Sequence, residues 1–325
     1  NIMQQRPHHL LRLAAGDRNR IFFGDDSAPG TYEPLPYLTV VNGEKDLGPF
    51  AEEINADILY ITSPEQMKRC QNVKYKKLVY DCCDWMGGAD SWLIEHADHI
   101  LCASRLLYDK VRGIVKEETS KEIFTKSNDN LPHENVFKVI YLPNACDFDH
   151  FSKTGESMPK APEPIVGYMG CIHPVMIDDA IIKALAEKYR LLMIGQNKGT
   201  EFNHPNIYAT GHVPYNHLPQ LLSQCKVGII PFHTDTDYLR YSAPIKVYEY
   251  LAAGRPVVAS PIPELQPLAD MGLIRIVAND DLEGWVKAVG KAINEYPNVK
   301  GQEWVKTQTW NNRYETLKKE VLERG

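Results

Sequence analysis

Two charged side chains, Lys246 and Glu249, stand in a short stretch that is otherwise almost entirely apolar. They are three residues apart, so a helix would place them on one stripe of its surface. A lysine in the first turn opposes the helix dipole unless an anion binds there, held by the lysine and by backbone N–H groups such as that of Ile245. Glu249 would then accept hydrogen bonds from hydroxyl groups attached to the same anion.

A diphosphate next to a diol is the simplest ligand with both features, and a nucleotide sugar has this chemistry. The spacing therefore predicts a nucleotide-sugar site in which Lys246 and Ile245 bind the diphosphate. The alternative is a surface pair of opposite charges, which would stabilise the helix by only about 0.2–0.5 kcal/mol.

Two glycines, Gly170 and Gly195, each follow a stretch that we expect to form a buried strand. The lack of a side chain would let a phosphate approach the backbone closely, so both are candidates for binding the diphosphate. A tight turn between strand and helix is the alternative explanation for each. His212 and Val213 close a further strand, where backbone polar groups would contact the edge of a base.

The first half of the chain contributes two more candidates, Asp84 and Arg6. Asp84 follows a strand expected over 77–81, and its carboxylate could act as a general base toward an acceptor hydroxyl. Capping of its own loop is the alternative. Arg6 lies in the first turn of an expected helix, where it would share the anion or simply be solvated.

The local sequence explains how Lys246 and Glu249 would be held. Pro244 suits a first helical turn, and Gly254 suits the position just past the last turn. Pro256 then prevents continuation of the helix before a short buried strand. Short strands alternate with helices along the whole chain, which is typical of parallel sheets with right-handed crossovers.

We therefore predict an α/β fold with two Rossmann-like, doubly wound domains facing across a cleft, with ligands outside the carboxyl ends of the strands. A linker is expected over 152–164. It separates an acceptor-side domain over 1–155 from a donor domain over 156–300, and a C-terminal helix follows over 301–325. A helix start lies close to Asn1, so we expect the first strand and its glycine-rich loop to be absent from the sequence.

The composition disfavours several other classes of protein. Of the 325 residues, 24% are charged and 43% hydrophobic, as in ordinary globular proteins. A net charge of -6 argues against a nucleic-acid partner. Seven scattered cysteines without metal-ligand spacing favour free thiols in a reducing cytosol and no metal site. The sequence shows neither an apolar run of membrane-spanning length nor a visible signal peptide. We therefore expect a cytoplasmic protein, which could also contact the inner face of the membrane.

Several motifs resemble those of one family. The run PIKVYEYLAAGRPVV at 244–258 resembles the donor-binding segment of GT-B glycosyltransferases, most closely that of the teichuronic-acid and related exopolysaccharide transferases. Similar motifs occur in the same order along essentially the whole chain: QRPHHL at 5–10, YDCCD at 80–84, LPNACDFDHF at 142–151, VGYMG at 166–170 and GHVPY at 211–215.

The resemblance implies that Lys246 contacts the donor diphosphate, that Glu249 holds the nucleotide ribose, and that Val213 with His212 meets the base through its backbone. It also implies that the final helix crosses back to the first domain. Two departures leave the stereochemistry open. Tyr241 stands where related retaining transferases carry a second glutamate, and residues 170–173 lack the arginine and lysine found near that loop.

The sequence thus predicts a metal-independent glycosyltransferase of polysaccharide or glycoconjugate biosynthesis. It would move a sugar from a nucleotide-diphosphate donor, with UDP favoured, to a saccharide or lipid-linked acceptor, and no bound cofactor is expected. Asp84 would be the base if the reaction inverts and would position the acceptor if it retains. The alternatives are a sugar-nucleotide epimerase of the same fold and a non-catalytic partner subunit. At the surface, the helix after Ser104 and residues 74–77 would be either solvated or in peripheral contact with a membrane.

Overall fold

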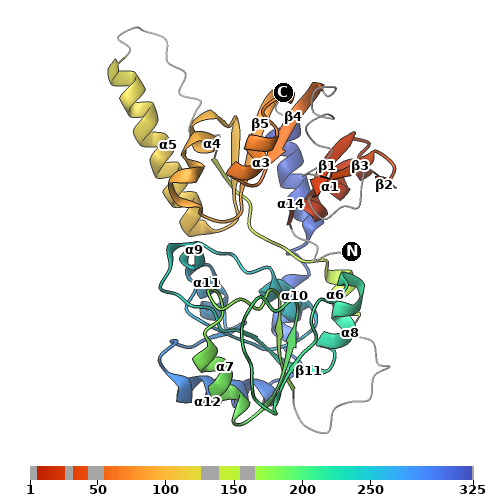
Figure 1. Cartoon of the computed structure of the whole chain (residues 1–325), viewed down its shortest axis with the longest axis vertical. Helices are drawn as coiled ribbons and strands as arrows, with labels where there is room; N and C mark the ends of the chain where they lie inside the picture. The colour runs from red at the N-terminus through yellow and green to blue at the C-terminus, as the bar shows by residue number, and fades with distance from the viewer. Residues whose placement is uncertain (1–5, 26–31, 43–54, 126–138, 154–164, 324–325) are drawn as a thin grey trace. The chain divides into compact units, whose positions relative to one another are not determined.

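A computed structural model of the chain describes residues 6–25, 32–42, 55–125, 139–153 and 165–323 (Figure 1). These residues divide into two compact units. One contains residues 144–312, and the other combines residues 6–143 with residues 313–323. The chain therefore passes between the units at Pro143–Asn144 and returns at Asn312–Arg313.

The unit of residues 144–312 is built on a six-stranded parallel sheet with the order β10-β9-β8-β11-β12-β13. Its strands are β8 (Ile165–Met169), β9 (Arg190–Ile194), β10 (Ile207–Ala209), β11 (Cys225–Ile230), β12 (Val257–Ala259) and β13 (Arg275–Ile276). The strand order reverses between β8 and β11. Loops that follow these two strands therefore diverge, and this switch point is where open α/β sheets bind ligands.

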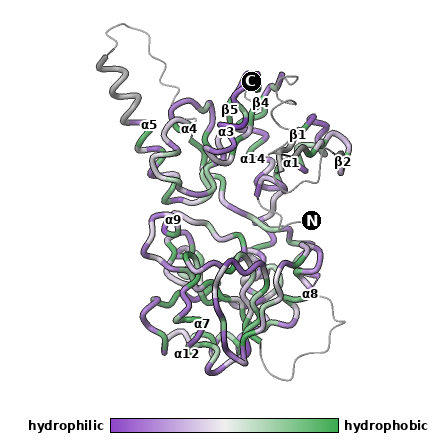
Figure 2. The backbone as a smooth tube through the Cα atoms, viewed as in Figure 1, coloured by the Kyte–Doolittle hydropathy of each residue, from purple (hydrophilic) through white to green (hydrophobic). Residues whose placement is uncertain are grey.

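The helices of this unit cover a sheet whose central strands are almost wholly buried, as parallel strands with two covered faces require. Hydrophobic stretches accordingly alternate with hydrophilic ones along the chain (Figure 2). Helices α7 and α12 pack against each other, and α10 packs against α6 and α13. The helices are α6 (Phe148–Ser152), α7 (Asp179–Ala186), α8 (Leu218–Leu222), α9 (Asp237–Arg240), α10 (Lys246–Ala252), α11 (Gln266–Asp270), α12 (Leu282–Asn294) and α13 (Val299–Val305).

The other unit contains two sheets. A four-stranded parallel sheet has the order β4-β5-β6-β7, and a three-stranded sheet has the order β1-β3-β2. The strands are β1 (Ile21–Asp25), β2 (Tyr32–Leu35), β3 (Leu38–Asn42), β4 (Asn55–Ile61), β5 (Lys74–Cys82), β6 (His99–Cys102) and β7 (Val139–Tyr141). The helices before residue 144 are α1 (Arg6–Gly16), α3 (Pro64–Arg69), α4 (Ser91–His96) and α5 (Arg105–Thr125).

The C-terminal segment joins this second unit from Arg313 onward. It comprises most of α14 (Trp310–Leu317) and the π-helical turn Lys318–Leu322. The Lys318 ammonium pairs with Asp17 at 2.6 Å, and the Tyr314 hydroxyl donates to the same carboxylate at 3.1 Å.

The boundary between the units differs from the predicted one. It lies at 143/144 and not after residue 155, because residues 144–152 pack within the unit that ends at residue 312. Helix α6 contacts α10, and the Cys146 N–H donates to the Gln308 carbonyl at 3.1 Å. The C-terminal region, expected as one helix over 301–325, is two helices and a π-helical turn, and α13 stays with residues 144–312.

Most predicted strands and helices lie within a few residues of the observed ones, and the Ser104 hydroxyl caps α5 by accepting from the Leu107 N–H at 3.2 Å. Strand β2 runs antiparallel to β3. The linker expected over 152–164 falls largely outside the described residues. Within the described residues, no helix is both long and apolar enough to cross a membrane.

Candidate functional site

Lys246 is the first residue of α10, and its side chain lies against two aromatic rings at the switch point of the six-stranded sheet. Its Nζ is 4.2 Å from the ring centroid of Tyr168 on β8 and 4.4 Å from that of Phe232, which follows β11. It donates a hydrogen bond to the Tyr168 hydroxyl at 3.0 Å. No carboxylate among the described residues forms an ion pair with this ammonium. Burial lowers the pKa of Lys246 to about 7, so a bound anion would restore its charge.

Glu249 lies one turn further along α10 and is 7% exposed. In the part of the chain that the structure describes, its carboxylate has no hydrogen-bond or ion-pair partner. Burial raises the pKa of Glu249 to about 8, although the positive charge of Lys246 acts in the opposite direction. A buried carboxyl group without partners is costly, and hydroxyl groups of a ligand would satisfy it.

Tyr250 fixes α10 to the sheet. Its hydroxyl accepts a hydrogen bond from the Met169 N–H at 2.7 Å, next to the loop after β8. Its ring fills the space left by Gly228 on β11, where an added Cβ would lie 2.5 Å from the ring. Gly254, with a φ of +68°, then ends the helix. The two charged residues are therefore carried on a helix locked to both strands of the switch point.

Gly170 and Gly195 have different roles in this structure. An added Cβ on Gly170 would lie 2.7 Å from the Lys246 Nζ, so this glycine keeps the space beside the ammonium open. An added Cβ on Gly195 would lie 2.0 Å from the Gly170 carbonyl oxygen. Packing of the two loops thus explains Gly195 without a ligand, and it holds Gly170 in place.

The loop with His212 and Val213 lies beside these glycines, because Gly211 forms an isolated bridge with Gly195. The His212 side chain is exposed and that of Val213 is half-buried. Ile245 immediately precedes α10, and among the described residues its backbone N–H has no hydrogen-bond acceptor. The predicted donor-site residues of this unit therefore gather at the carboxyl ends of β8, β9 and β10.

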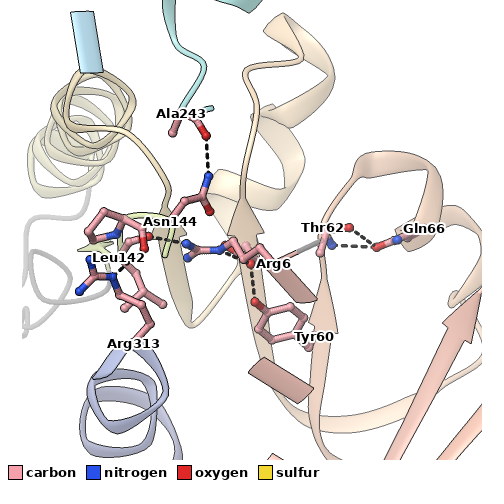
Figure 3. Close-up of polar contacts among 10 residues, drawn as sticks. Arg6, Tyr60, Thr62, Gln66, Leu142, Asn144, Ala243 and Arg313 are labelled. Carbon is pink, nitrogen blue, oxygen red and sulfur yellow. Dashed lines mark hydrogen bonds and ion pairs between the residues drawn. The ribbon is translucent and has the colours of Figure 1, made fainter. Parts of the chain in front are cut away.

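Arg6 belongs to the other unit, and its guanidinium already has protein partners (Figure 3). Its Nε contacts both carboxylate oxygens of Asp81, at 2.9 and 2.8 Å, and its Nη1 donates to the Leu142 carbonyl. The Tyr60 hydroxyl donates to the same carboxylate. Arg6 is 2% exposed and Asp81 fully buried. Burial alone would lower the pKa of Arg6, but the charge of Asp81 raises it. The observed geometry is thus a buried structural ion pair and not the predicted anion contact.

Asp84, in the loop after β5, differs from its two acidic neighbours. Asp81 is paired as described, and Asp90 accepts hydrogen bonds from the Tyr80 hydroxyl at 2.6 Å and the Met86 N–H at 2.7 Å. No described residue forms a hydrogen bond or ion pair with the Asp84 carboxylate. Burial raises its pKa to about 6, and the charges of Asp81 and Asp90 add to this effect. A carboxyl group tuned in this way can exchange a proton near neutral pH.

Sequence reasoning missed Tyr168 and Phe232, the two rings that flank the Lys246 ammonium. Tyr168 lies on β8, two positions before Gly170. Alternate residues of a strand share a face, so the sequence could have indicated that Tyr168 lies on the same side as Gly170. Phe232 carried no such signal. No group of three or more His, Cys, Asp or Glu side chains gathers as a metal site in the described segments.

One family model matches most of the unit of residues 144–312. Residues 164–295 match the family model described as Glycosyl transferases group 1. This range contains the whole six-stranded sheet together with Lys246, Glu249 and Gly170. This part of the chain is therefore similar to the group 1 glycosyl transferases.

Solved structures and a curated relative add the fold and one particular neighbour. Sucrose-phosphate synthase (tll1590) from Thermosynechococcus elongatus matches with a TM-score of 0.68 at 13% identity, over 96% of this chain and 90% of its own. Anabaena Alr3699/HepE in complex with UDP and glucose matches with a TM-score of 0.56 at 13% identity, over 82% and 78%. The predicted GT-B fold is thereby confirmed.

The curated relative is the "Putative teichuronic acid biosynthesis glycosyltransferase TuaH" of Bacillus subtilis (strain 168). It is 23% identical over 282 residues, which cover 75% of this chain and 66% of that protein. The chain therefore spans just under two thirds of the length of this relative.

Proposed function

We propose that the chain is a glycosyltransferase that moves a sugar from a nucleotide-diphosphate sugar, with UDP as the favoured nucleotide, to an acceptor hydroxyl in polysaccharide biosynthesis. The observation that carries this proposal is the pair Lys246 and Glu249 on one face of α10. Glu249 is buried and Lys246 is half-buried, and neither has an ion-pair partner among the described residues. The Lys246 ammonium lies directly beside the Gly170 backbone. Its two side chains offer a cation for a diphosphate and a carboxylate for a diol.

In the proposed reaction Lys246 binds the diphosphate and neutralises negative charge as the sugar leaves. Such stabilisation is strongest in a site shielded from water, and the Lys246 side chain is half-buried against the rings of Tyr168 and Phe232. The Ile245 N–H and the backbone at Gly170 assist at the phosphates. A bound diphosphate favours the charged ammonium, and that charge in turn favours ionisation of Glu249, which accepts hydrogen bonds from the ribose hydroxyls.

Asp84 is the proposed catalytic carboxylate on the acceptor side. If the reaction inverts the anomeric centre, Asp84 removes the proton from the acceptor hydroxyl. If it retains, Asp84 positions the acceptor. Its lack of hydrogen-bond partners among the described residues and its pKa of about 6 suit both roles. His212 and Val213 are proposed to contact the base, and the acceptor is proposed to be a saccharide or a lipid-linked saccharide.

The similarity to the group 1 glycosyl transferases and the teichuronic-acid relative support sugar transfer over the two alternatives, an epimerase and a non-catalytic subunit. UDP is favoured because Alr3699/HepE, a structural neighbour, was solved with UDP and glucose. Metal independence is part of the proposal, since Lys246 supplies the cation, and turnover in the presence of EDTA tests it.

Calorimetric titration of UDP into wild type and Lys246→Met tests the site. Loss of a charge-assisted contact should weaken UDP binding roughly 10- to 100-fold. Lys226→Met is the matched control, because the Lys226 ammonium also lies over a ring of the same unit, 4.1 Å from the Tyr296 centroid. Equal UDP affinity in wild type and Lys246→Met would remove the diphosphate assignment.

A further inference from the structure

Asn144 belongs to the LPN motif at 142–144 and is the first described residue of the unit of residues 144–312. Its side chain is 5% exposed. Its side-chain Nδ2 donates a hydrogen bond of 2.6 Å to the carbonyl oxygen of Ala243 (Figure 3). The two residues are 99 positions apart in the sequence. A buried amide therefore ties the point where the chain enters this unit to the segment that leads into α10.

The Ala243 carbonyl is outside the hydrogen-bond ladder of α10. The first helical bonds use the carbonyls of Pro244 and Ile245, which accept from the N–H groups of Val247 and Tyr248 at 3.3 and 3.0 Å. Among the described residues no backbone N–H donates to the Ala243 carbonyl. Asn144 thus supplies the hydrogen bond that the helix itself does not supply, directly before Pro244.

The segment on which Asn144 lies is itself fixed. Two residues later, the Cys146 N–H donates to the Gln308 carbonyl at 3.1 Å, and Cys146 pairs with Thr309 in an isolated parallel bridge. On the other side of Ala243, the Ser242 hydroxyl donates to the Leu239 carbonyl at 2.8 Å. Asn144 therefore connects two segments that are each held by further hydrogen bonds, directly before α10 begins.

We infer that Asn144 is a positioning residue for the donor site: by holding the Ala243 carbonyl it sets the start of α10 and hence the placement of Lys246 and Glu249. The inference rests on the proposed function for its ligand. Glu249 has no hydrogen-bond partner among the described residues, so the backbone alone fixes its position. Small displacements of such groups are costly, because binding depends on their distance from the ligand.

The test compares full-length wild type with Asn144→Ala and with Asn206→Ala. Asn206 is the matched control, because its Nδ2 also donates to a backbone carbonyl of this unit, that of Ala186, at 2.8 Å. Asn144→Ala should weaken UDP binding about five- to tenfold, the equivalent of one neutral hydrogen bond. It should also shift the pH midpoint of UDP binding and speed amide exchange in residues 242–252. Asn206→Ala should show none of these three effects.

Asn144→Ser, which keeps a shorter donor, is the second variant if Asn144→Ala does not fold. Its UDP affinity should be lower than that of wild type and of Asn206→Ala, but by less than fivefold. Equal UDP affinity and equal exchange at 242–252 in the Asn144 and Asn206 variants would overturn the inference. If wild type itself fails to bind UDP, the proposed function fails separately, and amide exchange in residues 242–252 still decides whether Asn144 positions α10.

Discussion

Two pairs of opposite charges, one fully buried and one partly buried, distinguish the two units of this protein. In the unit of residues 6–143 and 313–323, Arg6 and Asp81 are in direct contact, and the Tyr60 hydroxyl donates a further hydrogen bond to the Asp81 carboxylate. In the unit of residues 144–312, Lys246 and Glu249 share a helix face, yet no ion pair joins them. Arg6 and Asp81 thus neutralise each other by direct contact. In the second pair Lys246 donates to the Tyr168 hydroxyl but meets no carboxylate, and the Glu249 carboxyl group has no hydrogen-bond partner among the described residues.

The ionisation of the two pairs differs in the same way. Burial opposes the charge of Arg6, but the adjacent Asp81 carboxylate raises the pKa of the guanidinium and keeps it charged. Burial lowers the pKa of Lys246 to about 7 and raises that of Glu249 to about 8, so both lose charge at neutral pH. Complete pairing is what a structural ion pair needs, and incomplete pairing of partly or fully buried charges is the pattern that led us to propose a ligand site at α10.

The largest expected effect of breaking either pair is on stability, at Arg6. Arg6→Met should destabilise its unit by about 3–5 kcal/mol, because it leaves the Asp81 carboxylate buried without its cation. Urea unfolding, followed by a probe in this unit, measures the change. The exposed pair Lys76–Asp57 provides the control, and Lys76→Met should leave the unfolding midpoint nearly unchanged. A similar midpoint for both variants would contradict a structural role for Arg6.

Lys246→Met should have the opposite sign and a smaller size. Methionine retains the length and removes a half-buried ammonium whose pKa is lowered. The ligand-free protein should therefore be stabilised by about 1–2 kcal/mol, while UDP binding weakens roughly 10- to 100-fold. Thermal unfolding without ligand, together with the UDP titration described above, measures both effects. A loss of stability in this variant would mean that the Lys246 ammonium is already satisfied within the protein.

How much of this contrast could be predicted from sequence follows from the range of the interactions. The Pro244 and Gly254 signals and the three-residue spacing of Lys246 and Glu249 are local, and α10 forms where they indicate. Arg6 and Lys246 carry the same local signal, a cation at a helix start. Only the tertiary structure separates them, because the partner of Arg6 lies 75 residues away on β5. The Ala243 contact of Asn144 and the ring of Phe232 were hidden for the same reason.

Glu249→Gln sharpens the contrast through pH. In wild type the pKa of Glu249 rises from its ordinary 4.5 to about 8, so between these values the folded protein keeps a proton that the unfolded chain has released. Stability attributable to this group is therefore fully present below pH 4.5 and is lost as pH rises toward 8, by at most about 1.4 kcal/mol per pH unit. Glutamine mimics the protonated acid and removes this slope.

The comparison is made on thermal midpoints of the ligand-free proteins between about pH 5 and 6, below the pKa of about 7 at which Lys246 titrates in the folded state. The wild-type midpoint should fall relative to that of Glu249→Gln as pH rises through this window. Saturating UDP should reduce the difference between the two slopes, because the ligand supplies the charge and the hydroxyl groups that the ionised carboxylate lacks in the free protein. Parallel midpoints for the two proteins across the window would show that Glu249 is ionised without a ligand, and the distinction from the self-satisfied Arg6–Asp81 pair would then disappear.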